Sequence, residues 1–249
     1  MIALEYFDFI WTDKFAFAVA AAFLAGTVRG FSGFGAGLVM TPLLALVYGP
    51  VDAVVIMMVT VLVGGMQMIP AAMPYATKRD LVPIAIACVF ATPVGTYVLV
   101  TGDPDSMRRF IGAFVLVSAL IMLMGWSYTG RRNMRVCFAA GIVSGFANGA
   151  GGVGGPPVTL YLISSSEPAV VKRSNIAMAS TLQAILTVAP LAYSGVVSIE
   201  LLLRSAALLI PFVAALIIGG RLFSRANDRI YRLFALWLLV AIGVTVTFI

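Results

Sequence analysis

The sequence contains no histidine, which excludes metal sites and catalytic triads that depend on an imidazole group. It has only 2 cysteines, Cys88 and Cys137, and both lie in apolar runs, which excludes a disulfide framework. No acidic residue lies in the middle of an apolar run, so an intramembrane enzyme would lack its acid, base or activated nucleophile. We therefore predict that the protein is not an enzyme and needs neither a metal nor a cofactor.

Charged residues are also scarce, at 10% of 249 residues, whereas soluble domains carry about 25%. In their place, 61% of the residues are hydrophobic, and the mean hydropathy is +1.06. Uncharged apolar runs, most of them near the roughly 20 residues that cross a bilayer, cover residues 53–77, 81–101, 110–130, 174–199, 205–220 and 233–249. The sequence predicts an all-α, polytopic membrane helix bundle, with residues 1–249 forming a single membrane domain inside the lipid bilayer.

The net charge of +6 would suggest a nucleic-acid partner in a soluble protein. Here most basic residues lie in short loops between apolar runs, where they set membrane orientation. We therefore predict no nucleic-acid binding.

Two glycine-rich segments interrupt the apolar sequence, GFSGFGAG at 30–37 and NGAGGVGGPP at 148–157. Glycine costs a helix interior about 1 kcal/mol relative to alanine, so each cluster predicts a helix break. Within a bilayer, such a break is tolerated only where protein or a water-filled cavity covers the freed backbone groups. The flanking segments 15–29 and 36–48 are about 22 Å and 20 Å long as helices, and we expect neither to cross the membrane alone.

The second half of the chain repeats the plan of the first. A shift of 119 residues pairs Gly26 with Gly145, Gly30 with Gly149, Gly33 with Gly152, Gly35 with Gly154, and Arg29 with Asn148. This spacing predicts two repeats, 15–127 and 134–249, each with a broken first unit followed by three spans. Internal repeats with broken helices at matching positions are typical of secondary transporters.

Loop charges favour one of two topologies. If each broken unit crosses the membrane, the basic loop residues divide almost evenly, 7 against 8. If each unit instead returns to its starting side, one side has the 4 residues Lys14, Arg108, Arg109 and Arg204. The other side then has the 11 residues Lys78, Arg79, Arg131, Arg132, Arg135, Lys172, Arg173, Arg221, Arg225, Arg229 and Arg232. The positive-inside rule favours the uneven division, which predicts two re-entrant hairpins, inverted repeats and both termini outside.

Arg29 is the only charged residue well inside an apolar unit. A buried arginine in a bilayer usually faces a cavity or a partner, and its planar guanidinium suits oxyanions. The alternative is that Arg29 extends to the membrane surface or pairs with a carbonyl group. Asn148, at the matching position, either supplies a neutral donor to the same site or caps a half-helix.

The helices that resume after the breaks direct their N-termini, which attract anions, toward the same region, and Pro156-Pro157 fits such a helix start. The candidate substrate-binding residues are Arg29, Gly30, Ser32, Gly33, Phe34, Gly35, Asn148, Gly149, Gly151, Gly152, Gly154 and Pro156. Glycines can also serve tight helix packing. Other polar residues inside spans, among them Ser180, Thr181 and Gln183, either line a path or bond between helices.

The segments AGTVRGFSGFGAGLVMTPLL at 25–44 and SGFANGAGGVGGPPVTLYL at 144–162 resemble the sulfite exporter TauE/SafE family. The patterns MRRFIGAF at 107–114 and IYRLFALW at 230–237 add to this resemblance, which runs the full length. It implies a transporter of the bacterial inner membrane for small anions such as sulfite, sulfonates like sulfoacetate, or related organic acids.

The resemblance implies an exporter. We expect it to work by alternating access and to be driven by the membrane potential, because no histidine or acidic residue lies mid-span to carry protons. Proton coupling carried by the substrate itself is the second possibility. An importer and an anion channel are the alternative functions.

Overall fold

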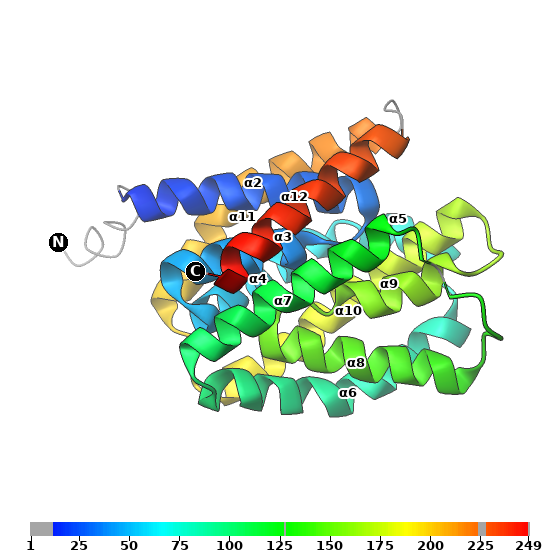
Figure 1. The fold of residues 1–249 in the computed structure, drawn as a ribbon, viewed down its shortest axis with the longest axis horizontal. Helices are drawn as coiled ribbons and strands as arrows, with labels where there is room; N and C mark the ends of the chain where they lie inside the picture. The colour runs from blue at the N-terminus through cyan, green and yellow to red at the C-terminus, as the bar shows by residue number, and fades with distance from the viewer. Residues whose placement is uncertain (1–11, 127, 224–227, 249) are drawn as a thin grey trace.

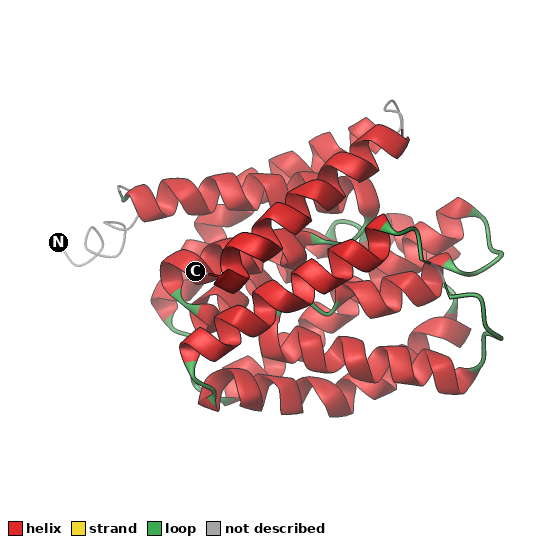
Figure 2. Cartoon of the chain, in the orientation of Figure 1, coloured by secondary structure: helices red, strands yellow, loops and turns green. Residues whose placement is uncertain are grey.

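The computed structural model describes residues 12–126, 128–223 and 228–248 (Figure 1). In chain order these residues form α2 (Asp13–Ser32), α3 (Ala36–Tyr48), α4 (Pro50–Met66), α5 (Ile69–Ala72), the 3₁₀ helix η2 (Met73–Tyr75), α6 (Lys78–Thr101), α7 (Pro104–Leu123), α8 (Met134–Gly151), α9 (Gly155–Ile163), α10 (Ala169–Tyr193), α11 (Ile199–Phe223) and α12 (Asp228–Phe248). No strand occurs in these ranges, as Figure 2 shows. The predicted all-helical bundle is confirmed.

Several helices are long and apolar enough to cross a membrane. Among the described residues, 5 helices meet this standard alone, namely α2, α6, α7, α10 and α11. A sixth span forms if α4 is joined with the α5–η2 segment, from which it is bent by 57°.

The bend inside the apolar run 53–77 lies just before Pro70, whose ring and missing N–H interrupt the helical bonds. One expectation about these helices is wrong, because the first break starts later than Gly30. Helix α2 continues to Ser32, and its 20 residues meet the length of a membrane span. At Gly30 this helix packs closely against α11.

The first glycine-broken unit folds into a hairpin. Gly26 of α2 lies against Phe212 of α11 and Gly30 lies against Leu216, so α2 and α11 run parallel and start at the same end of the molecule. The Arg204 guanidinium, near the start of α11, lies 4.8 Å from the centroid of the Tyr48 ring at the end of α3. The chain therefore returns through α3 to the end where α2 began.

The second broken unit has the same form at the other end of the molecule. Gly141 and Gly149 of α8 lie against Ile84 and Thr92 of α6, so these two helices are also parallel. Arg132, just before α8, lies 4.6 Å from the centroid of the Tyr161 ring near the end of α9. Segments α8 and α9 thus form a hairpin that opens in the opposite direction to the first.

Each hairpin packs against a helix of the other half of the chain. A Cβ on Gly30 would lie 2.1 Å from the carbonyl oxygen of Leu216, and one on Gly149 would lie 2.2 Å from that of Thr92. Both glycines therefore let two helix backbones approach closely, as small residues do in membranes. The α2–α11 and α8–α6 contacts are reciprocal, and they join the two halves into one body.

We expect Gly30→Ala and Gly149→Ala each to lower the free energy of unfolding by about 3 kcal/mol, because the methyl group overlaps a backbone carbonyl. Thermal unfolding of the purified protein in detergent measures this loss. Gly220→Ala is the control, since its added Cβ would meet nothing nearer than 3.9 Å. Equal melting temperatures for all three variants would contradict the packing role.

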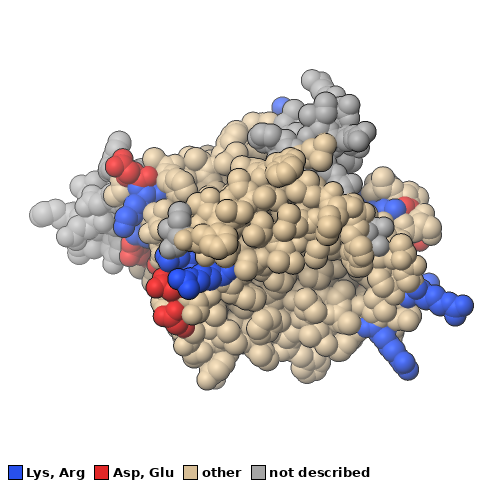
Figure 3. All heavy atoms as spheres, viewed as in Figure 1, with Lys and Arg blue, Asp and Glu red and all other residues tan. Residues whose placement is uncertain are grey.

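On the face shown in Figure 3, most charged side chains lie at the two ends of the molecule, and the surface between these ends is largely uncharged. One end, called the basic end here, holds the residues around the starts of α6, α8 and α10, namely Lys78, Arg79, Arg131, Arg132, Arg135, Lys172 and Arg173. The opposite end holds Lys14, Arg108, Arg109 and Arg204, near the starts of α2, α7 and α11. Arg225 lies outside the described residues, so its position adds nothing to this division.

Candidate functional site

The two glycine-rich breaks touch each other. Backbone φ angles of 82° at Gly33, 89° at Gly35 and 67° at Gly152 are left-handed, which turns the chain without the strain that a side chain would add. A Cβ on Gly37, in the first turn of α3, would lie 1.9 Å from the carbonyl oxygen of Gly152. The tip of each hairpin therefore lies directly against the tip of the other.

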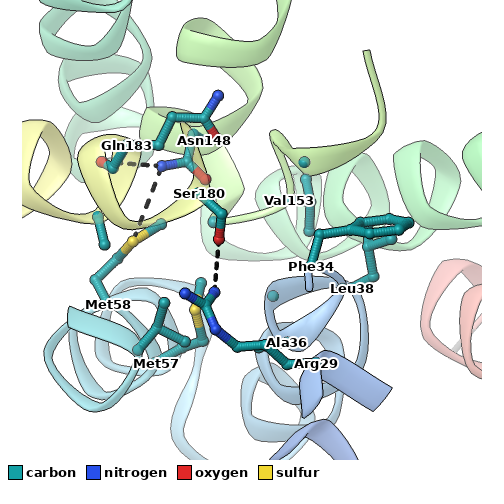
Figure 4. Close-up of a pocket in the computed structure, with 16 residues that line it drawn as sticks. Arg29, Phe34, Ala36, Leu38, Met57, Met58, Asn148, Val153, Ser180 and Gln183 are labelled. Carbon is teal, nitrogen blue, oxygen red and sulfur yellow. Dashed lines mark hydrogen bonds between the residues drawn. The ribbon is translucent and has the colours of Figure 1, made fainter. Parts of the chain in front are cut away.

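A cavity of about 30 Å³ lies between the hairpin tips (Figure 4). Its walls are formed by the two breaks and by side chains of α4 and α10, including Met57, Met58 and Gln183. This volume holds on the order of two water molecules. An anion that enters must therefore be small, or it must displace the flexible methionine side chains.

Arg29 supplies the positive charge of this cavity. Its side chain is only 1% exposed, and its Nη1 and Nη2 atoms donate hydrogen bonds to Ser180 Oγ at 2.6 Å and Thr181 Oγ1 at 3.4 Å. The Nε atom is buried without a hydrogen-bond partner. Among the described residues no carboxylate forms an ion pair with Arg29. The guanidinium is thus a buried cation held by neutral hydroxyl groups, with donors left over for an anion.

Space for the guanidinium is created by Gly65 on α4. A Cβ at this position would lie 2.8 Å from Arg29 Nη2 and 2.9 Å from Thr181 Oγ1. The guanidinium therefore sits between α4 and α10 rather than at a membrane surface. The alternative in which the Arg29 side chain extends to the membrane surface is therefore wrong.

The N-terminus of α3 adds backbone donors to the cavity. Ala36, Gly37 and Leu38 form its first turn and line the cavity, and no side chain caps the helix. The N–H groups of a first helical turn have no partner within the helix, and the helix dipole makes them attractive to anions. Arg29 and this helix start therefore favour the same kind of ligand.

The N-terminus of α9 contributes less. The helix begins at Gly155, which lines the cavity, and Pro156 and Pro157 follow in its first turn. Proline fits a helix start, as predicted, but it has no N–H to offer. The two helix starts are therefore unequal, and the donors come mainly from the first hairpin.

Asn148 lies in the cavity wall, but its amide nitrogen is used within the protein. The Nδ2 group donates to Thr187 Oγ1 at 2.7 Å and to the Gln183 carbonyl oxygen at 3.3 Å, and it lies 3.9 Å from Met58 Sδ. Gln183 in turn donates to Ser144 Oγ at 2.7 Å. Asn148 therefore links α8 to α10 rather than offering these donors to a ligand.

The structure brings some of the predicted site residues together at the cavity, namely Arg29, Phe34, Gly35, Asn148 and Gly152. Others lie nearby in different roles. The Ser32 hydroxyl lies 2.7 Å from the carbonyl oxygens of both Val28 and Phe34, which share its single proton, and Gly33 caps α2. A Cβ on Gly154 would lie 2.0 Å from the Ser144 carbonyl oxygen, and Pro156 is buried in α9.

Three predicted residues lie at helix contacts instead of the cavity. Gly30 and Gly149 face α11 and α6, and a Cβ on Gly151 would lie 2.7 Å from the Ile111 side chain of α7. Sequence reasoning missed Met57, Met58 and Gly65, since such residues carry no chemical signal inside a span. It also left Gly37 out of the candidate residues, although Gly37 belongs to the first glycine-rich segment. Ser180 and Gln183 carried the weak signal of polarity within an apolar run.

The described residues contain no group of three or more histidine, cysteine, aspartate or glutamate side chains that could hold a metal ion. The free thiols of Cys88 and Cys137 are buried, and neither of them lines the cavity. The cationic and backbone donors that line the cavity are the Arg29 guanidinium and the first N–H groups of α3, groups of the kind that anions accept hydrogen bonds from.

Comparison with known proteins agrees with this chemistry. The family model for the sulfite exporter TauE/SafE matches residues 18–246, nearly the whole chain, which includes the tips of both hairpins and the complete cavity wall. No curated protein and no solved structure matches the chain. The family comprises membrane transporters of sulfur anions such as sulfite. With its apolar helices and its match over almost all of its length, the chain belongs to the sulfite exporter TauE/SafE family.

Proposed function

We propose that the protein carries small anions, sulfite or organosulfonates, across the bacterial inner membrane and binds them in the cavity between the hairpin tips. The observation that carries this proposal is Arg29, a buried guanidinium that lacks a carboxylate partner among the described residues. An uncompensated buried charge is costly, and a bound anion removes that cost. The first turn of α3 stabilises the same anion through its free N–H groups.

Alternating access is the mechanism we propose, with residues 15–127 and 134–249 as inverted repeats. The oppositely directed hairpins and the reciprocal contacts α2–α11 and α8–α6 support this arrangement. A binding site at the contact between two such repeats can open to either side when one repeat moves against the other.

Export follows from the charge of the substrate. A cytoplasm that is negative by 100 mV drives out a monoanion by about 2.3 kcal/mol without a coupling ion. None of the described residues that line the cavity is acidic, so no side chain in its wall is suited to carry a proton with the anion. These points favour transport over catalysis and favour export driven by the membrane potential.

Flux measurements in proteoliposomes test this function. We expect the uptake of hydrogen sulfite to quicken when a potassium diffusion potential makes the lumen positive and to slow when it makes the lumen negative. Insensitivity to the potential would overturn potential-driven transport, and a rate that follows the pH gradient would show that the substrate carries the proton. Counterflow exchange of labelled against unlabelled sulfite is expected of a carrier, and its absence would indicate a channel.

Membrane orientation gives a separate prediction. The basic end holds most of the loop cations, so we expect it to face the cytoplasm and both chain termini to lie outside. A phosphatase fused after Ile249 should be active, and a fluorescent protein that matures only in the cytoplasm should stay dark at the same site. A cytoplasmic C-terminus would contradict the hairpin arrangement in the membrane.

A further inference from the structure

A second cavity adjoins the Arg29 cavity and is lined by Lys172 and Arg173, two residues of the basic end. It has a volume of about 450 Å³ and lies among the tip of the first hairpin, the ends of α7 and α9, the start of α10 and α12. We call this cavity the vestibule. The smaller cavity holds about 30 Å³ and shares Phe34 and Gly35 with it, so the two spaces adjoin.

The wall of the vestibule combines an apolar surface with two cations. Met122, Leu160, Leu236 and Leu239 are among the apolar residues that line it, and Trp126 lies at the same wall. Lys172 and Arg173, in the first turns of α10, supply the positive charge. Such a wall favours a ligand that has a carbon chain as well as an anionic group.

Arg173 also connects the vestibule to the hairpin that carries Arg29. Its Nη2 atom donates a hydrogen bond of 2.7 Å to the carbonyl oxygen of Gly30. Its side chain passes close to the cap of α2, since a Cβ on Gly33 would lie 3.6 Å from Arg173 Cγ. Arg173 is therefore bonded to the C-terminal end of α2, and the same end of α2 carries Arg29 into the smaller cavity.

Phe34 separates the two cavities. It lines both of them, and its ring packs beside the start of α9, where a Cβ on Gly155 would lie 3.4 Å from Phe34 Cδ2. Figure 4 shows the ring beside Val153 and Leu38. The Ser32 hydroxyl donates to the Phe34 carbonyl oxygen at 2.7 Å and so fixes the turn that carries the ring. A ligand in the vestibule can therefore be held without reaching Arg29.

We propose that the vestibule is a second binding site, which takes short-chain aliphatic anions with the anionic group at Lys172 and Arg173 and the chain against the apolar wall. Binding at this site does not depend on the proposed transport function. Only its role in transport does, which is to hold a substrate before the substrate passes Phe34. Its volume exceeds that of the Arg29 cavity by a wide margin, so organic anions fit there and inorganic sulfite gains little from its apolar surface.

Fluorescence of Trp126 tests the proposal. The chain has 3 tryptophans, so Trp11→Phe combined with Trp237→Phe leaves Trp126 as the sole reporter in the purified full-length protein. Titration with a series from methanesulfonate to hexanesulfonate should change its emission, and the apparent dissociation constant should fall roughly two- to fourfold for each added CH₂ group. Sulfite should give a much weaker response.

Two comparisons distinguish an anion site from a purely apolar groove. Hexanol has the same chain without the charge, and we expect it to bind at least tenfold more weakly than hexanesulfonate. Lys172→Gln should weaken hexanesulfonate binding about three- to tenfold and leave the hexanol response unchanged. Equal responses to hexanol and hexanesulfonate would overturn the proposal and indicate a groove that takes lipid chains. Affinity that does not depend on chain length would overturn it as well.

Arg29→Met in the same reporter protein distinguishes the vestibule from the transport site. We expect this variant to lose transport and to keep the Trp126 titration, because Phe34 stands between the two cavities. If wild-type protein showed no transport but kept the chain-length series, the proposed function would fail while the vestibule site stood. Loss of the Trp126 response in Arg29→Met would overturn the separate site.

Discussion

Replacing Arg29 with methionine should reduce anion transport by about 100-fold or more and should not lower the melting temperature. The loss follows because removing one member of a buried, hydrogen-bonded charge pair costs about 2–5 kcal/mol, and each 1.4 kcal/mol is a factor of ten. Stability should hold or rise because Arg29 is 1% exposed and has no carboxylate partner among the described residues. An apolar side chain of similar volume is often neutral or stabilising where it replaces a buried charge.

Sulfite flux into proteoliposomes and thermal unfolding with and without sulfite measure the two effects. Arg131→Met is the matched control, because Arg131 is exposed at the basic end and its removal leaves the cavity intact. Arg29→Lys should recover part of the flux, since the charge remains but the planar fork is lost. If Arg29→Met melted well below wild type, the side chain would be structural. If sulfite still raised its melting temperature, the anion would be held elsewhere.

Gly37→Ala should prevent the two hairpin tips from meeting and should destabilise the protein by about 3 kcal/mol or more. The added Cβ would lie 1.9 Å from the carbonyl oxygen of Gly152, a distance that neither backbone can relieve without moving. Because this contact forms one side of the cavity, sulfite should also cease to raise the melting temperature.

Gly155→Ala is the matched control, since Gly155 lines the same cavity from the second hairpin and its Cβ would meet only Phe34 Cδ2, at 3.4 Å. We expect a melting temperature within a few degrees of wild type for this variant. Size-exclusion profiles and unfolding temperatures in the same detergent compare the two. A stable Gly37→Ala protein would show that the hairpin tips do not need to touch.

The sequence predicted the breaks because glycine clusters disfavour helix wherever they occur. It did not predict their limits, since Gly30 and Gly149 have the same local preference as Gly33 and Gly152. Gly30 lies in the contact between α2 and α11, where its missing side chain leaves room for the carbonyl group of Leu216, a residue far along the chain. Helix ends set by such distant contacts cannot be read from local composition.

Arg29 could be found from sequence because a charge inside an apolar run is rare and costly. Its hydrogen-bond partners could not be found in the same way, because Ser180 is one of many hydroxyl residues that serve helix contacts in membranes. Gly65 is equally inconspicuous, yet its missing side chain makes the room for the guanidinium. The buried charge of Arg29 was therefore predictable from sequence. The shape of the cavity around it was not, because that shape depends on how distant helices pack.

The exchange of helices between the two halves has a consequence for how the protein is made. Arg29 precedes its partner Ser180 by 151 residues, and α2 precedes its packing partner α11 by still more. At about 5–20 residues per second, a ribosome needs roughly 8–30 s to supply Ser180 after Arg29 has left it. During this interval the first hairpin has neither its helix partner nor its hydroxyl ligands, and it carries a cation that lipid does not solvate. We therefore expect the N-terminal half to reach its final packing only after the second half has been inserted.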